Sequence, residues 1–256
     1  MAAKMQENPT PQTSFVRIKQ SIHRVFDLVY PRLCIFCHSK IKANNDYNIC
    51  SACAAEIKTI NAPFCLRCGA VLEQLSQIRV NGCSRCSNKK YYFDQVFSAC
   101  KYKGKVKSCI HFFKYKRKIK TKNILSDLLI EFLNANFPTK NIDLITAVPL
   151  HKHKLQERGF NQSKLIADKL SEFFKIESSH NNLCRVKKTV SQVTLSAQKR
   201  KLNTADAFAC KDPDKFKNKR ILLIDDIFTT GSTLNECAKV IKQSGAKNIT
   251  CLTIAR

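Results

Sequence analysis

Residues 221–233 read ILLIDDIFTTGST. The apolar run Ile221–Ile224 predicts a strand that is buried on both faces of a parallel sheet. Two carboxylates follow the run, then a group of hydroxyl side chains around Gly231, and then a helical pattern. Ligands of open α/β sheets bind where strands end and helices begin. Because backbone N–H groups and the helix dipole attract anions there, this stretch predicts a phosphate site.

The acidic pair Asp225 and Asp226 must serve another part of the ligand, because carboxylates repel phosphate. Two neighbouring sugar hydroxyls suit the pair, with Mg²⁺ nearby to offset the charge. The stretch closely resembles the signature of type I phosphoribosyltransferases, which bind phosphoribosyl pyrophosphate. The resemblance implies that the acidic pair contacts the ribose 2′- and 3′-hydroxyls. It also implies that a loop wraps the 5′-phosphate, and this loop consists of Thr229, Thr230, Gly231, Ser232 and Thr233. The alternative is a buried strand, a turn and a helix cap that bind no ligand.

Charge is strongly unbalanced along the 256 residues, with 45 Lys and Arg against 19 Asp and Glu, a formal +26. Such an excess predicts polyanionic partners, namely nucleic acid, phosphorylated metabolites or a membrane surface. A general abundance of lysine in the proteins of the source organism is the alternative. The length suffices for one full α/β core and a small second module.

Fourteen cysteines are present, and eight of them form four C-x-x-C pairs. We see no signal peptide, because basic residues interrupt the first apolar segment, and no apolar run reaches 18 residues. A reducing cytoplasm with metal-bound thiolates is therefore expected, rather than disulfides. The pairs are Cys34 with Cys37, Cys50 with Cys53, Cys65 with Cys68, and Cys83 with Cys86.

Each C-x-x-C turn directs two sulfurs to one point, so two turns complete a tetrahedral zinc site. Sequential pairing gives two zinc ribbons within residues 34–90, and crossed pairing of the first with the third turn stays open. We expect one or two structural zinc ions. Redox chemistry is the weaker reading, because thioredoxin-type motifs do not occur four in a row. The other six cysteines are expected to lie in the core.

Residues 1–33 are predicted to hold a disordered tail and then an amphipathic helix with a basic face. The helix is expected to pack on its own domain, with a membrane or partner surface as the alternative.

Residues 95–126 contain no acidic residue and ten Lys or Arg, with aromatic residues interleaved. Basic grooves with aromatic platforms hold single-stranded nucleic acid by charge and stacking. The structural alternative puts Val106, Ile110 and Phe113 in the core and leaves the lysines as a solvated face. The DNA-binding candidates are Lys114, Tyr115, Lys116, Arg117, Lys118 and Lys120.

Residues 91–256 are predicted to form an α/β domain, a parallel sheet flanked by helices. Expected elements include a helix over 124–137, a strand over 143–149, a helix to about Phe174, a helix over 232–244 and a last strand over 248–254. A basic loop follows the strand at 143–149. In phosphoribosyltransferases the corresponding loop meets the pyrophosphate, so the resemblance makes His151 and Lys152 candidates for that role.

Several further motifs occur in an order that resembles the ComF family, and within it the ComFC-like competence proteins. The resemblance runs from about Cys34 to the end of the chain. The motifs are the four C-x-x-C pairs, Tyr102-Lys103-Gly104, Val148-Pro149, Arg158-Gly159-Phe160-Asn161-Gln162, a Thr189, Gln192 and Leu195 set before Arg200 and Asn203, and residues 221–233.

The ComF resemblance implies a double zinc ribbon joined to a phosphoribosyltransferase-like domain. It implies a cytoplasmic role in natural competence and DNA uptake, with single-stranded DNA, phosphoribosyl pyrophosphate or a related nucleotide, and proteins of the uptake machinery as partners. The alternative is an active phosphoribosyltransferase of nucleotide metabolism. Where 6-oxopurine salvage enzymes carry an aspartate, this chain has Thr229. Glutamine amidotransferase activity is not expected, because the chain begins Met1-Ala2-Ala3 without a glutaminase domain.

Overall fold

The computed structural model divides the described residues into two units, one up to Glu56 and one from Ile57 onward. The predicted tail and nearly all of the predicted N-terminal helix lie outside the described residues, as do Thr189, Gln192, Leu195, Arg200 and Asn203. The described residues are 31–42, 45–61, 63–74, 82–116, 118–187 and 206–256.

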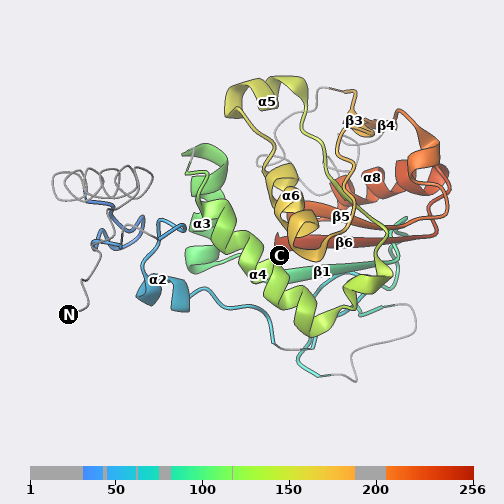
Figure 1. Ribbon diagram of the computed structural model, residues 1–256. Coiled ribbons are helices and arrows are strands. Elements are labelled where there is room, and N and C mark those ends of the chain that lie inside the picture. The colour runs from blue at the N-terminus through green and yellow to red at the C-terminus, as the bar shows by residue number, and fades with distance from the viewer. Residues whose placement is uncertain (1–30, 43–44, 62, 75–81, 117, 188–205) are drawn as a thin grey trace, which may run out of the picture. The chain divides into compact units, whose positions relative to one another are not determined.

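A sheet of four parallel strands forms the centre of the second unit, in the order β1-β6-β5-β2 (Figure 1). This confirms the predicted parallel α/β fold. An isolated parallel bridge between Ile145 and Ser178 extends the sheet beyond β2. The strands are β1 (Gln95–Cys100), β2 (Leu144–Ala147), β5 (Arg220–Ile227) and β6 (Asn248–Ala255).

Strand β5 lies between β6 and β2, so its apolar residues pack on both faces of the sheet. Leu222, Leu223 and Ile224 are fully buried. The strand is longer than the apolar run predicted, because it continues to Ile227 and includes both acidic residues. The hydrogen-bonded partner β6 holds this extension, with Asp225 beside Thr253 in the register. The acidic pair is therefore fixed by the sheet rather than carried by a loop.

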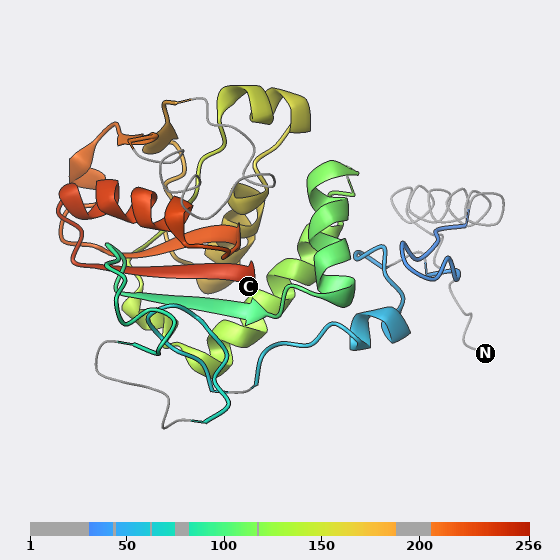
Figure 2. The same ribbon diagram turned by 180° about the vertical axis from the view of Figure 1, so that it is seen from behind.

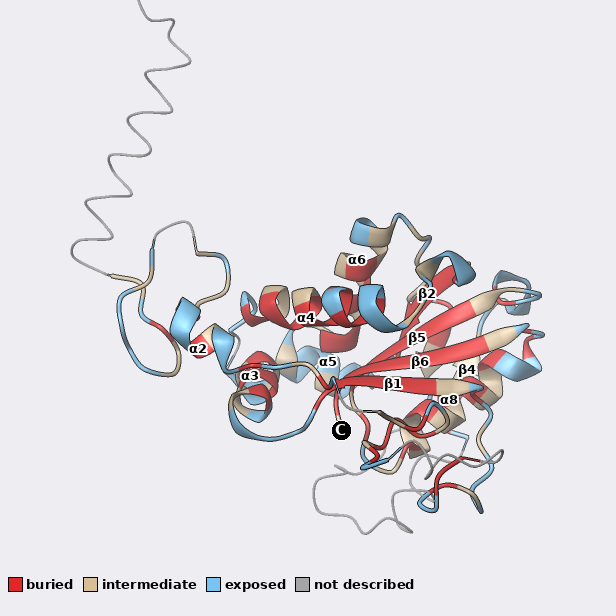
Figure 3. Cartoon of the chain, turned by 90° about the horizontal axis from the view of Figure 1, so that it is seen from below, coloured by how far each residue is buried: buried red, intermediate tan, exposed pale blue. Residues whose placement is uncertain are grey.

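Helices cover both faces of this sheet (Figure 3). Helices α4 (Thr121–Asn136) and α6 (Gln162–Phe174) pack on one face, and α8 (Ser232–Gln243) packs on the other. The three helices lie close to their predicted ranges. Each presents apolar residues to the sheet, which places the core in two layers on either side of β5 and β6.

Helix α3 (Gly104–Tyr115) lies beyond the carboxyl ends of β1 and β6 (Figure 2). Val106, Ile110 and Phe113 are all buried, as their helical spacing predicted. The helix therefore joins the core through one side while its other side faces the edge of the sheet where ligands bind in this fold class.

The segment after β2 differs from the expected loop. Residues Lys152–Arg158 form helix α5, with His151 as its N-cap and Gly159 in the left-handed conformation at its end. The His151 ring nitrogen Nδ1 accepts a hydrogen bond from the His153 N–H, at 3.3 Å, and this satisfies one free donor of the first turn. A side-chain cap of this kind was not recognised in the sequence.

Four short elements complete the second unit. Strands β3 (Leu183–Arg185) and β4 (Phe208–Cys210) pair antiparallel in a small separate sheet. The 3₁₀ helices η2 (Thr139–Asn141) and η4 (Pro213–Lys215) precede β2 and β5, respectively.

The third and fourth C-x-x-C turns are attached to the edge strand β1. Val96 N–H donates to the Leu66 carbonyl at 2.8 Å, and Ile60 N–H donates to the Ala99 carbonyl at 2.7 Å. These bonds use backbone groups that an edge strand would otherwise leave open. The first unit contains helix α2 (Ser51–Ala55) and an antiparallel bridge between Leu33 and Lys40.

Across the helices of the described residues, we find none that is both long enough and apolar enough to cross a membrane.

Candidate ligand pocket and metal centres

The loop between β5 and α8 contains a glycine that the conformation requires. Gly231 is the N-cap of α8 and has φ +80°, in the left-handed region. A Cβ atom at this position would lie 2.6 Å from the Phe228 ring. The Thr230 and Ser232 hydroxyls lie 2.8 Å apart, in hydrogen-bond contact at the start of the helix. The loop therefore presents hydroxyls and the N-terminus of α8 at one place, as an anion site needs.

Asp225 is buried and held in one orientation. Its Oδ1 accepts hydrogen bonds from the Ser163 hydroxyl at 3.1 Å and from the Asp226 N–H at 2.9 Å. Burial raises the pKa of Asp225 to about 6, although Lys114 and the Ser163 hydrogen bond act in the opposite direction. Removing this carboxylate from water is unfavourable for its charged form, and such perturbed groups are common at functional sites.

Lys114 reaches from α3 into the same site and forms an ion pair with Asp226. The Lys114 side chain is 16% exposed. Burial lowers the pKa of Lys114 to about 8, against the attraction of Asp225. The sequence made Lys114 a DNA-binding candidate on a solvated face, whereas the structure places its ammonium beside the acidic pair.

A cavity of about 310 Å³ opens beside the acidic pair and the phosphate loop. One wall comes from the end of β5 and the loop, and the facing wall comes from α3 and from Tyr102, which precedes it. The facing wall is partly aromatic, which the sequence motifs did not reveal. The lining residues are Tyr102, Ile110, His111, Lys114, Tyr115, Asp225, Asp226, Ile227, Thr229, Gly231, Ser232, Thr233 and Leu234.

The segment Arg158–Ser163 positions parts of this site. The Arg158 guanidinium lies 5.4 Å from the centre of the Tyr115 ring, and Arg158 also contacts Gln162. Asn161 caps α6 and donates to the Val148 carbonyl at 3.0 Å. Because Ser163 follows the cap directly, its hydroxyl is directed to Asp225. The motif was noted in the sequence, but the role of Ser163 requires the packing of α6 against β5.

The other predicted site residues are placed as follows. His151 and Lys152 are not among the described residues that line the cavity, so their role at a pyrophosphate stays a prediction. Tyr115 is 54% exposed. The lysines at 116, 118 and 120 are also exposed, which leaves them available to a polyanion, and Arg117 lies outside the described residues.

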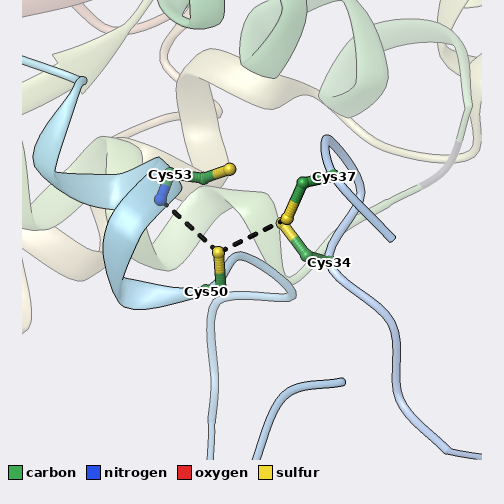
Figure 4. Close-up of side chains that lie close together, drawn as sticks. All are labelled: Cys34, Cys37, Cys50 and Cys53. Atoms are coloured by element: carbon green, nitrogen blue, oxygen red, sulfur yellow. Dashed lines mark hydrogen bonds between the residues drawn. The ribbon is translucent and has the colours of Figure 1, made fainter. Parts of the chain in front are cut away.

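The first two C-x-x-C turns bring four sulfurs together (Figure 4). Cys37 and Cys50 have sulfurs 3.6 Å apart, and the Cys53 N–H donates to the Cys50 sulfur at 3.4 Å. All four ligand atoms of Cys34, Cys37, Cys50 and Cys53 lie within 4.8 Å of one another. Tetrahedral zinc with Zn–S bonds of about 2.3 Å needs sulfurs about 3.8 Å apart, so this group fits zinc.

The second group joins the third and fourth turns and is buried. The sulfurs of Cys68 and Cys83 are 3.6 Å apart, and those of Cys65 and Cys86 are 3.8 Å apart. A Cβ atom at Gly82, which has φ +95°, would lie 2.5 Å from the Cys86 sulfur. The structure therefore assembles the four turns sequentially, and both groups have the donors and spacing of structural zinc.

Family models match two parts of the chain. The double zinc ribbon domain matches residues 25–100, and the phosphoribosyl transferase domain matches residues 158–256. The first match includes both cysteine groups, and the second includes the acidic pair and the phosphate loop.

Curated relatives match almost the whole chain. Competence protein F of Haemophilus influenzae is 30% identical over 87% of this chain and 96% of its own length. DNA utilization protein YhgH of Escherichia coli K12 is 30% identical over 90% of this chain and 99% of its own length. Competence protein ComFC of Bacillus subtilis is 24% identical over 89% of this chain and 96% of its own length.

A solved purine phosphoribosyltransferase from Pyrococcus horikoshii is 20% identical, with a TM-score of 0.31 over 51% of this chain and 68% of that one. A structural likeness of this level adds nothing to the assignment. The curated relatives do, because two of them match at 30% identity over nearly their full length. The chain therefore belongs to the ComF family, in which a double zinc ribbon is joined to a phosphoribosyl transferase domain.

Proposed function

We propose that this chain binds a phosphoribosyl ligand and handles single-stranded DNA in the cytoplasm during competence and DNA uptake. The observation that carries the ligand half is the cavity in which the acidic pair and the phosphate loop lie side by side. The DNA half is supported by full-length relatives named for competence and DNA utilization, and by the formal charge of +26.

The ligand binds with its 5′-phosphate at the N-terminus of α8 and its ribose at the acidic pair. Thr230, Ser232 and the backbone around Gly231 supply donors to the phosphate. Asp225 and Asp226 accept hydrogen bonds from the ribose hydroxyls. Their carboxylate oxygens also suit Mg²⁺, which would offset the negative charge of the pyrophosphate. Mg²⁺ usually keeps water at several of its coordination positions, so two carboxylates are enough to hold it.

Isothermal titration calorimetry with ribose 5-phosphate, with and without Mg²⁺, tests the ligand half. The double variant Asp225→Asn with Asp226→Asn is expected to lose the binding. Because it also removes the partner of Lys114, circular dichroism and zinc content are measured in parallel to establish that the variant is folded. Asp212→Asn with Asp214→Asn is a matched control, because both residues lie at the amino end of β5, outside the cavity. Undiminished affinity in the first double variant would refute the assignment.

Fluorescence anisotropy with a labelled oligonucleotide tests the DNA half. Binding is expected to weaken steeply with salt, with a log–log slope of about −0.7 for each neutralised phosphate. Replacing exposed Lys116, Lys118 and Lys120 by alanine tests the face predicted from the sequence. A wild-type protein that binds no single-stranded DNA even at low salt would contradict this half.

A second candidate function is phosphoribosyl transfer to a nitrogen acceptor. It is supported by the wall of Tyr102, His111 and Tyr115, which faces the phosphate loop across the cavity and offers rings to a base. Release of pyrophosphate from phosphoribosyl pyrophosphate in the presence of a panel of nucleobases tests this candidate. No release above the rate without acceptor would favour binding without catalysis.

A further inference from the structure

A second pocket, of about 370 Å³, lies where the second zinc ribbon meets the carboxyl end of β1. Four of its lining side chains are cationic, and none of its described lining residues is Asp or Glu. Arg85 belongs to the Cys83–Cys86 turn, so the zinc group fixes the backbone that carries it. The lining residues are Ile60, Gly69, Val71, Arg85, Lys101, Tyr102, Lys103 and Arg256.

Lys103 of this pocket lies at a helix position where a cation is disfavoured. Lys103 is the N-cap of α3 and makes no capping hydrogen bond through its side chain, and the first turn of the helix has no acidic residue. The N-terminus of a helix carries a partial positive charge and is stabilised by Asp or Glu, not by lysine. Sequences break such local rules most often at functional sites. An anionic ligand would offset the repulsion between the lysine and the positive end of the helix, because it would contact both.

Arg256 is one of the four cations of the pocket, and its side chain is held in place. Its guanidinium lies 4.9 Å from the centre of the Phe228 ring, which holds it in place. Its Nη1 is buried and has no hydrogen-bond partner among the described residues. The rest of the guanidinium adds positive charge to the pocket that Arg256 lines.

Two residues connect this pocket with the phosphoribosyl cavity. Tyr102 lines both, and its N–H donates to the Arg256 carbonyl at 2.7 Å. Phe228 carries the Arg256 guanidinium on its ring and packs against Gly231 of the phosphate loop. A strand in the second pocket would therefore lie next to the phosphoribosyl site.

We propose that this pocket binds the phosphodiester backbone of single-stranded DNA, with Tyr102 as a stacking platform for one base. The assignment rests on the DNA half of the proposed function and gives that function a site other than the lysines after α3. Four cations around one pocket exceed the needs of a single phosphate and suit successive phosphates of a strand. Tyr102 is 37% exposed, and only an unpaired base offers its face to such a ring.

The experiment compares two double variants of the full-length zinc-loaded chain. The pocket variant carries Lys101→Ala and Lys103→Ala, and the control variant carries Lys215→Ala and Lys217→Ala. Both double variants lower the net charge equally, and the control lysines are exposed at the other end of the sheet, before β5. Anisotropy with a labelled oligothymidylate measures affinity from low to physiological salt. The pocket variant is expected to bind at least tenfold more weakly at low salt, with a salt slope smaller by about 1.4 if each lysine neutralises one phosphate.

The outcomes separate this site from the wider proposal. Wild-type affinity in the pocket variant, with binding intact in the control, would overturn the site while the DNA function stands. No binding by the wild type would overturn both. Equal weakening in the two variants would mean that net charge alone acts, and would overturn the site. Duplex DNA is expected to compete poorly, and inorganic pyrophosphate should not displace the strand at equal phosphate concentration. If either competes as well as unlabelled oligothymidylate, a simple anion site replaces the proposal.

Discussion

Replacing Lys114 by methionine is the sharpest test of how the acidic pair is held. The change keeps the length of the side chain and removes the ammonium that pairs with Asp226. Breaking a buried ion pair by removing one partner costs about 3–5 kcal/mol, because the remaining charge is left in a dry site. At about 1.4 kcal/mol for each factor of ten, opening of this part of the fold becomes about 140 to 3700 times more frequent.

The pH dependence follows from Asp225. Its pKa is about 6 in the folded protein against an ordinary 3.8, so the folded state holds this proton more tightly than the unfolded chain. Stability is therefore highest below the ordinary pKa and falls as the pH rises towards 6. Without Lys114 the charged form of Asp225 loses an attraction, so its pKa rises further and the fall in stability extends above pH 6. The deficit of the variant is expected to be larger at pH 7, where Asp225 is mostly charged and Lys114 is still mostly protonated, than at pH 5, where Asp225 is mostly protonated.

Hydrogen exchange measured by mass spectrometry on the peptide that covers β5, residues 220–227, reads this local stability at each pH. Lys107→Met is the matched control, because this exposed lysine lies on the same helix, and it should change the exchange little. The double variant Lys114→Met with Asp226→Asn removes both charges and should recover part of the loss. Equal protection of β5 in wild type and Lys114→Met at pH 7, or a deficit that does not shrink at pH 5, would refute the reasoning.

Three other outcomes are expected. Elemental analysis under reducing conditions should find two zinc ions for each chain, and fewer than one would contradict the structural role of the cysteine groups. Gly231→Ala should lower the stability by about 1 kcal/mol or more in thermal unfolding and lose ribose 5-phosphate binding, because its Cβ meets Phe228. Gly159→Ala has a similar φ of +82° and nothing within 4 Å, so it should keep the binding. The Arg220 guanidinium lowers the pKa of Asp143 to about 2 through hydrogen bonds, so in NMR titration Arg220→Met should return that pKa towards 3.8. Stability from this pair should be lost as the pH falls below about 4, and an unchanged titration would show that the contact is absent in solution.

Much of the fold was predictable because its signals are local. The apolar run at Ile221–Ile224, the glycine after it and the helical pattern that follows define a strand, a loop and a helix without tertiary information. Three further elements, α4, α6 and β6, were predicted close to their observed bounds because each has a clear apolar period or run. Helix α5 was missed, since its residues Lys152–Arg158 have only Leu155 as an apolar member.

The site was predictable only where one contiguous segment forms it. The acidic pair and phosphate loop come from a single stretch. Ser163 reaches Asp225 from α6, and Lys114 and Tyr102 line the cavity from α3 and the residues just before it. Lysine in a run of lysines gives no signal that one ammonium is buried. The pairing of the cysteine turns likewise needed the structure, because spacing alone permits sequential or crossed groups.

The second zinc group supports the basic pocket as well as its own ribbon. Its turns are hydrogen-bonded to β1 through Val96 and place Arg85 at the basic pocket. The same strand leads directly into Lys101 and Tyr102, which line that pocket. Loss of metal from this group would therefore release Arg85 and one edge of the sheet together, since metal binding supplies folding energy to such small ribbons. Arg85 lies between two ligands of the second group, Cys83 and Cys86, whereas the first group consists of Cys34, Cys37, Cys50 and Cys53. Cys86→Ser is accordingly expected to weaken single-stranded DNA binding. Cys53→Ser is expected to leave the contribution of Arg85 to that binding unchanged. The same anisotropy titration measures both variants, and their zinc content is determined in parallel. Equal loss of DNA binding in the two variants would show that the ribbons act together rather than through the edge of the sheet.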